Sequence, residues 1–417
     1  MKRLIHAGAR SGRVVIPASK SQAHRLLICS ALAHRESTLI CRGISEDISA
    51  TISCLNALGA HIAIKGDTLV IRPVSDPELA EKHLFCRESG STLRFLLPVA
   101  GALGENALFH MEGRLPLRPM EPLTAALTEH GMYISRQDDL LICCGKLQSG
   151  SYTIAGNVSS QFISGLLMAL PLLKGDSTLE ISGAAESADY IAMTESALRL
   201  MGILFEKKAN GYYIYGGQHY CPESIFTVEQ DWSSAAFFLC MGAFSDKGIA
   251  VKGMSLSSLQ GDKQILPILR DFGAVVETGS EQITVCRGKL TGCCVDASGI
   301  PDLIPVICVL AAGAEGETRI INGGRLRFKE TDRLRTTAQM LASLGADITE
   351  TADGLIIKGK QRLSGGKTDS FNDHRIAMSA AVAAGICEND VTVDGAECTE
   401  KSYPGFWEDL EKMEING

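Results

Sequence analysis

Short runs of alternating apolar and polar residues, each ending in glycine, recur along the chain at a nearly constant interval. Alternation with a period of two is typical of a half-buried strand, and glycine suits the turn that follows it. The glycines that end these runs are Gly43, Gly113, Gly183, Gly253, Gly323 and Gly395, spaced by 70, 70, 70, 70 and 72 residues. A fixed period of this kind predicts six copies of one supersecondary unit.

A helical pattern of apolar residues follows each of these strands. In the first five units it stops at Gly59, Gly131, Gly202, Gly273 and Gly345, and in the sixth we expect it to run to the chain end at Gly417. Glycine directly after the last helical residue is the common left-handed helix cap. A hairpin pattern comes next, as at residues 62–64 and 68–71, and a further strand and a second helix complete the unit. The pattern therefore predicts a βαβαββ-type repeat.

The sixth helix has no hairpin behind it, and the N-terminus supplies the missing strands. Residues 4–6 and 13–17, with a glycine-flanked turn between them, match the pattern of residues 141–143 and 151–154. We therefore expect the N-terminus to close the sixth unit, so that the chain crosses between two domains near Pro17 and near Val228. A chain of 417 residues is also too long for one ordinary core. The prediction is an α/β (α+β) protein with domain I at 1–17 and 229–417 and an inserted domain II at 18–228, three repeats in each.

Composition and charge narrow the choice of partners. The formal net charge of −8 argues against a general role on nucleic acid or on a membrane surface. No segment has the uninterrupted apolar length of a membrane helix, and the N-terminus lacks a secretion signal. The 14 cysteines are scattered without metal-finger spacing, which favours free thiols over bridges or zinc. We expect a cytoplasmic protein that uses local positive charge for any anionic ligand.

Polar residues gather where the second helix of each unit is expected to begin. Serine, asparagine and aspartate there fit helix capping, worth about 1 kcal/mol each. Lys20, Arg25, Arg94 and Arg375, however, place cations in or just after these turns, where the helix dipole disfavours them. A bound anion explains such cations better than stability does.

The loops before the first helices carry more groups of the same kind. They contain Arg114, Arg118, Ser187, Tyr190, the turn Gln260-Gly261-Asp262, the charged run Lys-Glu-Thr-Asp-Arg at 329–333, and Lys401. Arginines and carboxylates divided between two domains suggest a pair of substrates that carry phosphate and carboxylate groups. We expect the active site in the interdomain cleft, closing around its substrates.

Five motifs, together with the repeat, resemble one known family. They are Ser19-Lys20-Ser21 followed by Arg25, Ser159-Ser160-Gln161-Phe162, Ile300-Pro301-Asp302, the run at 329–333, and Asn372-Asp373-His374-Arg375. Over essentially its whole length the chain resembles the 5-enolpyruvylshikimate-3-phosphate synthases. The resemblance implies a two-domain inside-out α/β barrel, and a monomer that needs no metal or organic cofactor. The implied reaction transfers the enolpyruvyl group of phosphoenolpyruvate to the 5-hydroxyl of shikimate 3-phosphate. It releases phosphate through a tetrahedral intermediate, on the shikimate pathway to chorismate and the aromatic amino acids.

The resemblance also implies which residues bind each substrate. For shikimate 3-phosphate they are Lys20, Ser21, Arg25, Ser159, Ser160, Gln161, Ser187, Asp302 and Lys329. For phosphoenolpyruvate they are Lys20, Gly90, Arg118, Gln161, Arg333, Arg375 and Lys401.

The reaction needs two acid–base groups, because the hydroxyl loses a proton while the methylene carbon gains one. Asp302 is the candidate base and Glu330 the candidate acid, with Lys20 and Lys401 sharing the proton transfers. Glu330 would need its pKa raised by burial, and the nearby cations oppose that. Asp332 is expected to pair with a neighbouring arginine.

Four positions depart from the family pattern. Glu88 replaces asparagine, Asp189 replaces proline, Trp232 replaces a small residue, and Arg325 replaces a polar contact; these substitutions bear on substrate affinity rather than on activity.

Three other functions are possible alternatives for this sequence. The related transferase that acts on UDP-N-acetylglucosamine uses a cysteine before the arginine matching Arg118, and residues 112–117 contain none. A non-catalytic anion-binding repeat protein would be free to lose the acid–base pair. An RNA-end-processing relative would need a more basic surface.

Overall fold

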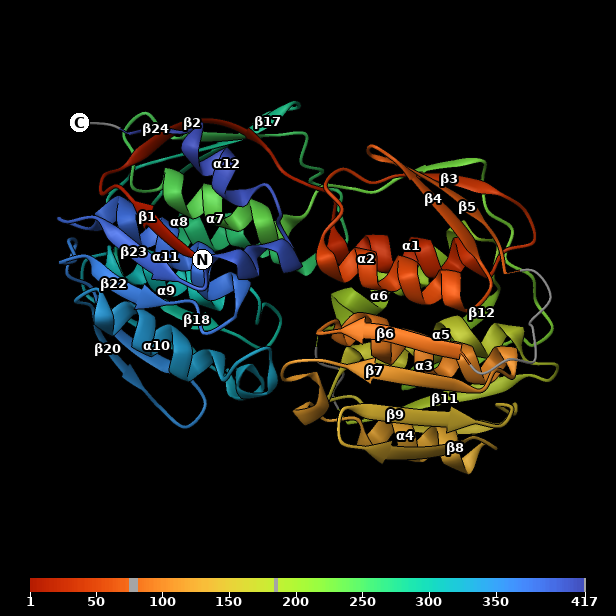
Figure 1. Ribbon diagram of the computed structural model, residues 1–417. Coiled ribbons are helices and arrows are strands. Elements are labelled where there is room, and N and C mark those ends of the chain that lie inside the picture. The colour runs from red at the N-terminus through yellow and green to blue at the C-terminus, as the bar shows by residue number, and fades with distance from the viewer. Residues whose placement is uncertain (75–81, 184–186, 416–417) are drawn as a thin grey trace. The chain divides into compact units, whose positions relative to one another are not determined.

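The computed structural model describes residues 1–74, 82–183 and 187–415 (Figure 1). Its elements follow the order strand, helix, strand, helix and two strands five times, and the sixth unit is completed by the N-terminal strand. Every sheet contains one parallel pair of strands, and in four of the sheets a single helix joins the two strands of that pair, as for β6 (Lys82–Arg87) and β7 (Ala107–Met111). A hairpin then adds antiparallel strands, as β8 (Tyr133–Gln137) and β9 (Leu140–Cys144) do. The βαβαββ repeat predicted from glycine spacing is therefore confirmed.

The described chain divides into two compact units, Met1–Pro17 with Glu229–Gly417, and Ala18–Val228. We call the first the split unit and the second the inserted unit. Each contains three sheets and six α-helices among its described residues.

The inserted unit has sheets in the orders β14-β3-β5-β4, β6-β7-β9-β8 and β10-β11-β13-β12. Its strands are β3 (Ser37–Ile40), β4 (His61–Lys65), β5 (Thr68–Arg72), β6 (Lys82–Arg87), β7 (Ala107–Met111), β8 (Tyr133–Gln137), β9 (Leu140–Cys144), β10 (Ser151–Ala155), β11 (Ser177–Ser182), β12 (Phe205–Lys208), β13 (Gly211–Ile214) and β14 (Ile225–Thr227). Its helices are α1 (Lys20–Ala31), α2 (Glu46–Ala57), α3 (Gly90–Leu103), α4 (Glu121–Glu129), α5 (Ser160–Ala169) and α6 (Ala188–Leu200), with the 3-10 turns η1 (Leu115–Leu117) and η2 (Leu170–Leu172).

The split unit has sheets in the orders β16-β17-β15-β2-β24, β18-β19-β21-β20 and β1-β23-β22. Its strands are β1 (Lys2–Ile5), β2 (Arg10–Val15), β15 (Ile249–Lys252), β16 (Val275–Thr278), β17 (Gln282–Cys286), β18 (Cys294–Asp296), β19 (Glu317–Ile321), β20 (Asp347–Glu350), β21 (Leu355–Lys358), β22 (Gly366–Asp369), β23 (Val391–Asp394) and β24 (Glu414–Ile415). Its helices are α7 (Trp232–Gly242), α8 (Ile265–Asp271), α9 (Ile304–Ala312), α10 (Arg333–Ser343), α11 (His374–Ala383) and α12 (Phe406–Glu411), with the 3-10 turns η3 (Gly261–Gln264), η4 (Gly324–Phe328), η5 (Ala384–Ile386) and η6 (Ala396–Lys401).

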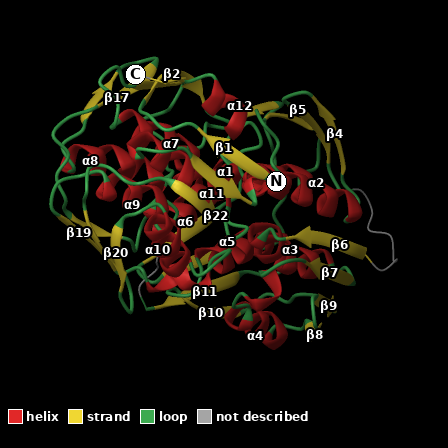
Figure 2. Cartoon of the chain, turned by 60° about the vertical axis from the view of Figure 1, so that its left-hand side comes forward, coloured by secondary structure: helices red, strands yellow, loops and turns green. Residues whose placement is uncertain are grey.

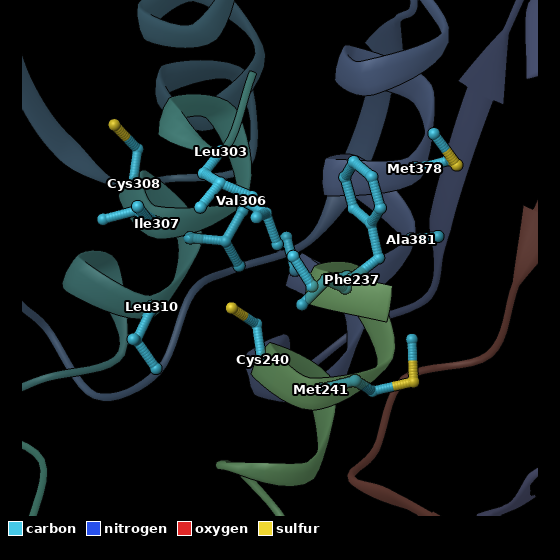
Figure 3. Packing of buried hydrophobic residues seen from close by; sticks show 14 of the residues in the cluster. Phe237, Cys240, Met241, Leu303, Val306, Ile307, Cys308, Leu310, Met378 and Ala381 are labelled. Carbon is cyan, nitrogen blue, oxygen red and sulfur yellow. The ribbon is translucent and has the colours of Figure 1, made fainter. Parts of the chain in front are cut away.

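Helices form the centre of the split unit and strands lie outside them. Every residue of α7, α9 and α11 is buried, because beyond the polar residues in their first turns these helices are apolar on nearly all sides and must be covered all round. Phe237 of α7, Val306 of α9 and Met378 of α11 belong to one buried hydrophobic cluster (Figure 3). Figure 2 shows strands β2, β17 and β19 at the outside of this helical core. The inside-out α/β arrangement expected from the family resemblance is therefore confirmed.

The N-terminus completes the sixth sheet, as the repeat predicts. Strand β1 pairs antiparallel with β23, placing Leu4 opposite Thr392, and β2 runs parallel to β15 in the neighbouring sheet. These pairings match those of β9 with β7 and of β10 with β11 in the inserted unit. The N-terminal strands thus occupy the positions that the missing hairpin and first strand leave open.

The expected extent of the last helix is wrong. Helix α12 ends at Glu411, and β24 then pairs antiparallel with β2, with Ile415 opposite Arg10. Between them Met413 is buried, with its sulfur close to the position a side chain would take at Gly12. Burial of this methionine and the strand pairing draw the chain out of the helix before its end. Gly417 itself lies outside the described residues.

No helix in the described ranges has the length and apolar character needed to cross a membrane.

Candidate active site

In the split unit the candidate site is built around Arg333, the first residue of α10. Its side chain is 1% exposed and contacts three carboxylates. Nη1 lies 2.7 Å from Asp302 Oδ1, Nη2 lies 2.7 Å from Glu330 Oε2, and Nε lies 2.8 Å from Asp373 Oδ2. Burial alone would lower the pKa of Arg333, but the charges of Asp373, Glu330 and Asp302 together raise it above its ordinary value. The guanidinium is therefore permanently charged and held in one orientation.

Asp302 lies at the start of α9 but does not cap it. The cap residue of α9 is Leu303, without a side-chain hydrogen bond to the helix. The Asp302 carboxylate instead lies 2.7 Å from Arg333 Nη1, 3.2 Å from Arg375 Nη2 and 3.5 Å from Lys329 Nζ. Three cations around one partly exposed carboxylate stabilise its charged form, in which it can accept a proton.

Lys329 has a pKa below that of an ordinary lysine. Burial, followed by the nearby charge of Arg333, lowers the pKa of Lys329 to about 8, although Asp302 and Glu330 oppose the shift. At neutral pH most Lys329 side chains still carry a proton. Lys329 can therefore carry positive charge for an anion at neutral pH and can release its proton near pH 8.

Sequence reasoning missed the role of Asp373, the N-cap residue of α11. Its side chain accepts from Arg375 N at 3.0 Å, from Arg333 Nε at 2.8 Å and from Thr331 Oγ1 at 3.1 Å. A fully buried carboxylate needs such partners, and here they fix Arg333 against α11. The available signal was the acid within Asn372-Asp373-His374-Arg375, which fits a cap equally well.

Lys401, the last residue of η6, donates to Asn372 O at 2.8 Å and so lies beside the same helix start.

A second buried carboxyl group is Asp262 in η3, which belongs to the Gln260-Gly261-Asp262 turn named in the sequence analysis. It accepts a hydrogen bond from Ser233 Oγ on α7. Burial, followed by the charge of Asp302, raises the pKa of Asp262 to about 7, and Arg375 acts in the opposite direction. Asp262 therefore exchanges a proton near neutral pH and lies within electrostatic reach of Asp302.

Asp332 performs the structural task expected of it. Its side chain caps α10 by accepting from Arg335 N, and its Oδ2 lies 2.9 Å from Arg327 Nη1. Arg327 also contacts Glu350 on β20 at 2.6 Å. The prediction of an arginine partner for Asp332 is confirmed, and the residue anchors the charged run rather than joining the cluster around Arg333.

In the inserted unit, two cations lie on the first turns of α1. Lys20 Nζ lies 2.7 Å from Asp47 Oδ2 on α2. Arg25 is buried and donates to Ser21 O at 2.7 Å, Thr194 Oγ1 at 2.7 Å and Tyr190 O at 2.9 Å. These bonds tie α1 to α6 and fix the turn that contains Ser21. Several N–H groups of Arg25 are thus already bonded within the protein. Its predicted contact with a substrate requires either a remaining N–H group or the replacement of one of these partners by the substrate.

A second group in the inserted unit is assembled by Arg94, which is buried on α3. Arg94 Nη1 donates to Gln161 Oε1 at 2.7 Å, and Nη2 donates to Pro119 O at 3.2 Å. Gln161 in turn donates from Nε2 to Ser91 Oγ at 2.8 Å. A side chain added at Gly90 would lie 2.8 Å from Arg118 Nη1, so this glycine permits the close approach of the guanidinium. Gly90, Arg118 and Gln161 are therefore brought together.

The remaining predicted residues lie at the starts of α5 and α6. Ser159 caps α5 by accepting from Gln161 N at 3.3 Å, and Ser160 is the first residue of that helix. Ser187 precedes α6 with a φ of 53°, a left-handed conformation that is uncommon for serine. Of the four departures from the family pattern, Trp232 is accounted for: it is buried in α7 and donates from Nε1 to Ser255 O.

Within the described ranges, no group of three or more histidine, cysteine, aspartate or glutamate side chains has the arrangement of a metal site. The chemistry that this arrangement offers is anion binding by arginine and lysine, with carboxylates placed to exchange protons.

Comparison with known proteins identifies the family. The model of the family described as EPSP synthase (3-phosphoshikimate 1-carboxyvinyltransferase) matches residues 6–410. A 3-phosphoshikimate 1-carboxyvinyltransferase of Clostridium kluyveri is 42% identical over 404 residues, covering 96% of this chain and 95% of the relative. One of Methanocorpusculum labreanum is 38% identical over 417 residues, covering 99% and 98%.

Solved structures agree. An EPSP synthase from Acinetobacter baumannii superposes with a TM-score of 0.80 at 26% identity, covering 100% of both chains. The enolpyruvyl transferase NikO from Streptomyces tendae gives a TM-score of 0.80 at 17% identity, covering 100% of this chain and 97% of that one, which supports the fold alone. With a family match over nearly the whole chain and relatives near 40% identity, this protein belongs to the EPSP synthase (3-phosphoshikimate 1-carboxyvinyltransferase) family.

Proposed function

We propose that this protein is an enzyme that transfers the enolpyruvyl group of phosphoenolpyruvate to the 5-hydroxyl of shikimate 3-phosphate and releases phosphate. Membership of the family and the names of its relatives support the reaction. The observation that carries it is the cluster in which Arg333, Arg375 and Lys329 surround Asp302. A non-catalytic anion-binding protein has no need of a carboxylate that competes with its ligand for these cations.

The anion-binding residues have proposed assignments. Phosphoenolpyruvate is held by Lys20, Gly90, Arg118, Gln161, Arg333, Arg375 and Lys401, and shikimate 3-phosphate by Lys20, Ser21, Arg25, Ser159, Ser160, Gln161, Ser187, Asp302 and Lys329. Each of the two units contains only part of either set. The two units are therefore proposed to be the domains of the enzyme, with the substrates bound in a cleft that domain closure completes.

In the addition step, Asp302 takes the proton of the 5-hydroxyl, whose oxygen forms a bond to C2 of phosphoenolpyruvate. Glu330 gives a proton to C3, which becomes a methyl group, and a tetrahedral phospho-ketal results. In the elimination step C3 returns a proton to the Glu330 carboxylate, the bond from C2 to the phosphate oxygen breaks, and the enol ether forms as phosphate leaves. Arg333, Arg375 and Lys401 stabilise the charge on the departing phosphate and on the carboxylate.

The contact between Glu330 and Arg333 adds a condition to this mechanism. An arginine 2.7 Å from a carboxylate favours its ionised form, in which Glu330 is no acid. A substrate anion that binds Arg333 competes for the same N–H groups and weakens that contact. Binding of phosphoenolpyruvate is therefore proposed to prepare Glu330 for protonation, so that the acid forms only when there is a substrate to receive its proton.

The enzyme is further proposed to act in the cytoplasm as a monomer without a metal or organic cofactor. The cations described above supply the positive charge that other phosphate-transforming enzymes take from a metal ion.

A phosphate-release assay with phosphoenolpyruvate and shikimate 3-phosphate tests the reaction. We expect turnover with this pair, unaffected by a chelator, and none when UDP-N-acetylglucosamine replaces shikimate 3-phosphate. Absence of turnover with shikimate 3-phosphate would overturn the assignment. Small-angle scattering tests closure, since compaction is expected when shikimate 3-phosphate is added and an unchanged profile would contradict it.

A further inference from the structure

The inserted unit contains a buried chain of polar side chains that the reaction does not use. His24 Nδ1 lies 2.7 Å from Thr51 Oγ1, Thr51 Oγ1 lies 2.7 Å from Thr92 Oγ1, and Thr92 Oγ1 donates to Ser89 Oγ at 2.7 Å. All four residues are fully buried. Burying polar groups in a core is costly unless they are hydrogen-bonded, and these four side chains bond to one another in a continuous chain. The chain passes from α1 through α2 to the start of α3, where Ser89 is the N-cap residue.

The direction of the hydrogen bonds follows from the number of protons available. Each hydroxyl has one proton to donate. Because Thr92 donates to Ser89, Thr51 must donate to Thr92, and His24 must then donate from Nδ1 to Thr51. Among the described residues nothing hydrogen-bonds to His24 Nε2. Burial, then the charges of Lys20 and Arg25, hold the pKa of His24 well below its usual range. The histidine is a neutral, fixed donor and not a proton carrier.

The chain runs beside residues that bind the proposed substrates. Lys20 and His24 lie one turn apart on α1, and their partners Asp47 and Thr51 lie one turn apart on α2. Both contacts therefore join α1 to α2, one turn apart. The hydrogen bond between His24 and Thr51 fixes how far α2 is shifted along α1, and with it the position of Asp47 opposite Lys20. At its other end Ser89 directly precedes Gly90, whose position against Arg118 leaves no room for a side chain.

We propose that His24, Thr51, Thr92 and Ser89 are positioning residues for phosphoenolpyruvate, which hold Lys20 and the Gly90 turn at a fixed separation within the inserted unit. The inference rests on the proposed function, because it assigns Lys20, Gly90 and Arg118 to that substrate. His24 and Thr51 touch no substrate in this proposal and act through the two elements that they join. The binding site is thereby assembled before any ligand arrives.

The test compares Thr51→Val with Thr51→Ser by steady-state kinetics. Valine has the shape of threonine but breaks the chain at two hydrogen bonds, whereas serine keeps the hydroxyl. We expect Thr51→Val to raise KM for phosphoenolpyruvate about three- to tenfold, in line with the loss of one or two hydrogen bonds. KM for shikimate 3-phosphate should rise less, because that substrate shares only Lys20 with phosphoenolpyruvate among the groups that the chain positions. Thr51→Ser should restore the wild-type KM. Thr92→Val, which breaks the next link, should repeat the selective increase.

The matched control is Thr318→Val on β19. Thr318 is equally buried, and its hydroxyl has no hydrogen-bond partner among the described residues, so its removal should change neither KM. Parallel changes in both KM values, or an unchanged KM for phosphoenolpyruvate in Thr51→Val and Thr92→Val, would overturn the positioning role. Turnover by the wild-type protein is measured in the same assay and decides the proposed function separately.

Discussion

Replacing Asp302 by asparagine tests the centre of the proposed mechanism. Asparagine keeps the size of the side chain but has neither the negative charge nor a site that can take the proton of the 5-hydroxyl. A general base contributes about 10²- to 10⁴-fold to a rate, equivalent to roughly 2.7–5.5 kcal/mol in the activation barrier. We therefore expect kcat of Asp302→Asn to fall at least ~100-fold.

The contacts of Asp302 predict further changes in this variant. Removing the carboxylate leaves Arg333, Arg375 and Lys329 without a negative charge that they share at 2.7, 3.2 and 3.5 Å. Asp302 is the largest of the charges that raise the pKa of Lys329, so this pKa should fall below its value of about 8. Arg333 keeps Glu330 and Asp373, so the loss of folding stability should not exceed about 3 kcal/mol, the upper range for a charged hydrogen bond.

The assay is steady-state phosphate release with both substrates varied, accompanied by thermal melting. Asp332→Asn is the control, because Asp332 is a carboxylate in the same charged run that caps α10 and pairs with Arg327. Asparagine caps helices nearly as well as aspartate, so kcat of the control should stay within about twofold of wild type. If Asp302→Asn retained kcat within about fivefold of wild type while folded, Asp302 would not be the base.

Three other predictions concern single residues of the site. Glu330→Gln should slow turnover at least ~100-fold in the same assay, and near-normal turnover would remove Glu330 from the mechanism. Gly90→Ala should raise KM for phosphoenolpyruvate more than KM for shikimate 3-phosphate, because the added methyl group would lie 2.8 Å from Arg118 Nη1; equal KM values in both enzymes would show that the guanidinium moves away freely. The pKa of Lys329 is lowered to about 8, so the protonated form that binds phosphate is lost as pH rises through that value, and kcat/KM for shikimate 3-phosphate should fall above pH 8. Lys329→Arg, which stays charged, should move this fall to higher pH, and an identical profile in both would assign the fall to another group.

The sequence predicts the fold well where a regular period determines it. The glycine spacing predicts six units, and the pairing of β1 with β23 confirms that the N-terminus closes the last one. The end of the chain could not be predicted in the same way. Burial of Met413 and the pairing of Ile415 with Arg10 depend on β2, which is about 400 residues away in sequence and unrelated to the helical pattern.

The site was predicted in part, because its cations are conspicuous and their partners are not. Lys20 and Arg375 attract attention at helix starts, where the dipole disfavours a cation. Asp373 and Asp47 do not, since an acid at a helix start is interpreted as a cap. Asp373 is in fact a cap and a ligand of Arg333 at once. The sequence pattern predicts the capping role of such a side chain. Its contact with a residue distant in sequence can be recognised only from the folded structure.

The start of α9 differs from the corresponding helix starts of the other repeats, because no side chain caps it. The other five inner helices are capped by the side chains of Ser19, Ser89, Ser159, Asp231 and Asp373. Helix α9 has no such cap, and Pro305 stands in its first turn, where the missing N–H of proline leaves fewer donors to satisfy. With less need of a cap, the backbone does not compete for the Asp302 carboxylate. Asp302 can then lie among Arg333, Arg375 and Lys329, which is why we propose it as the group that accepts the proton of the substrate.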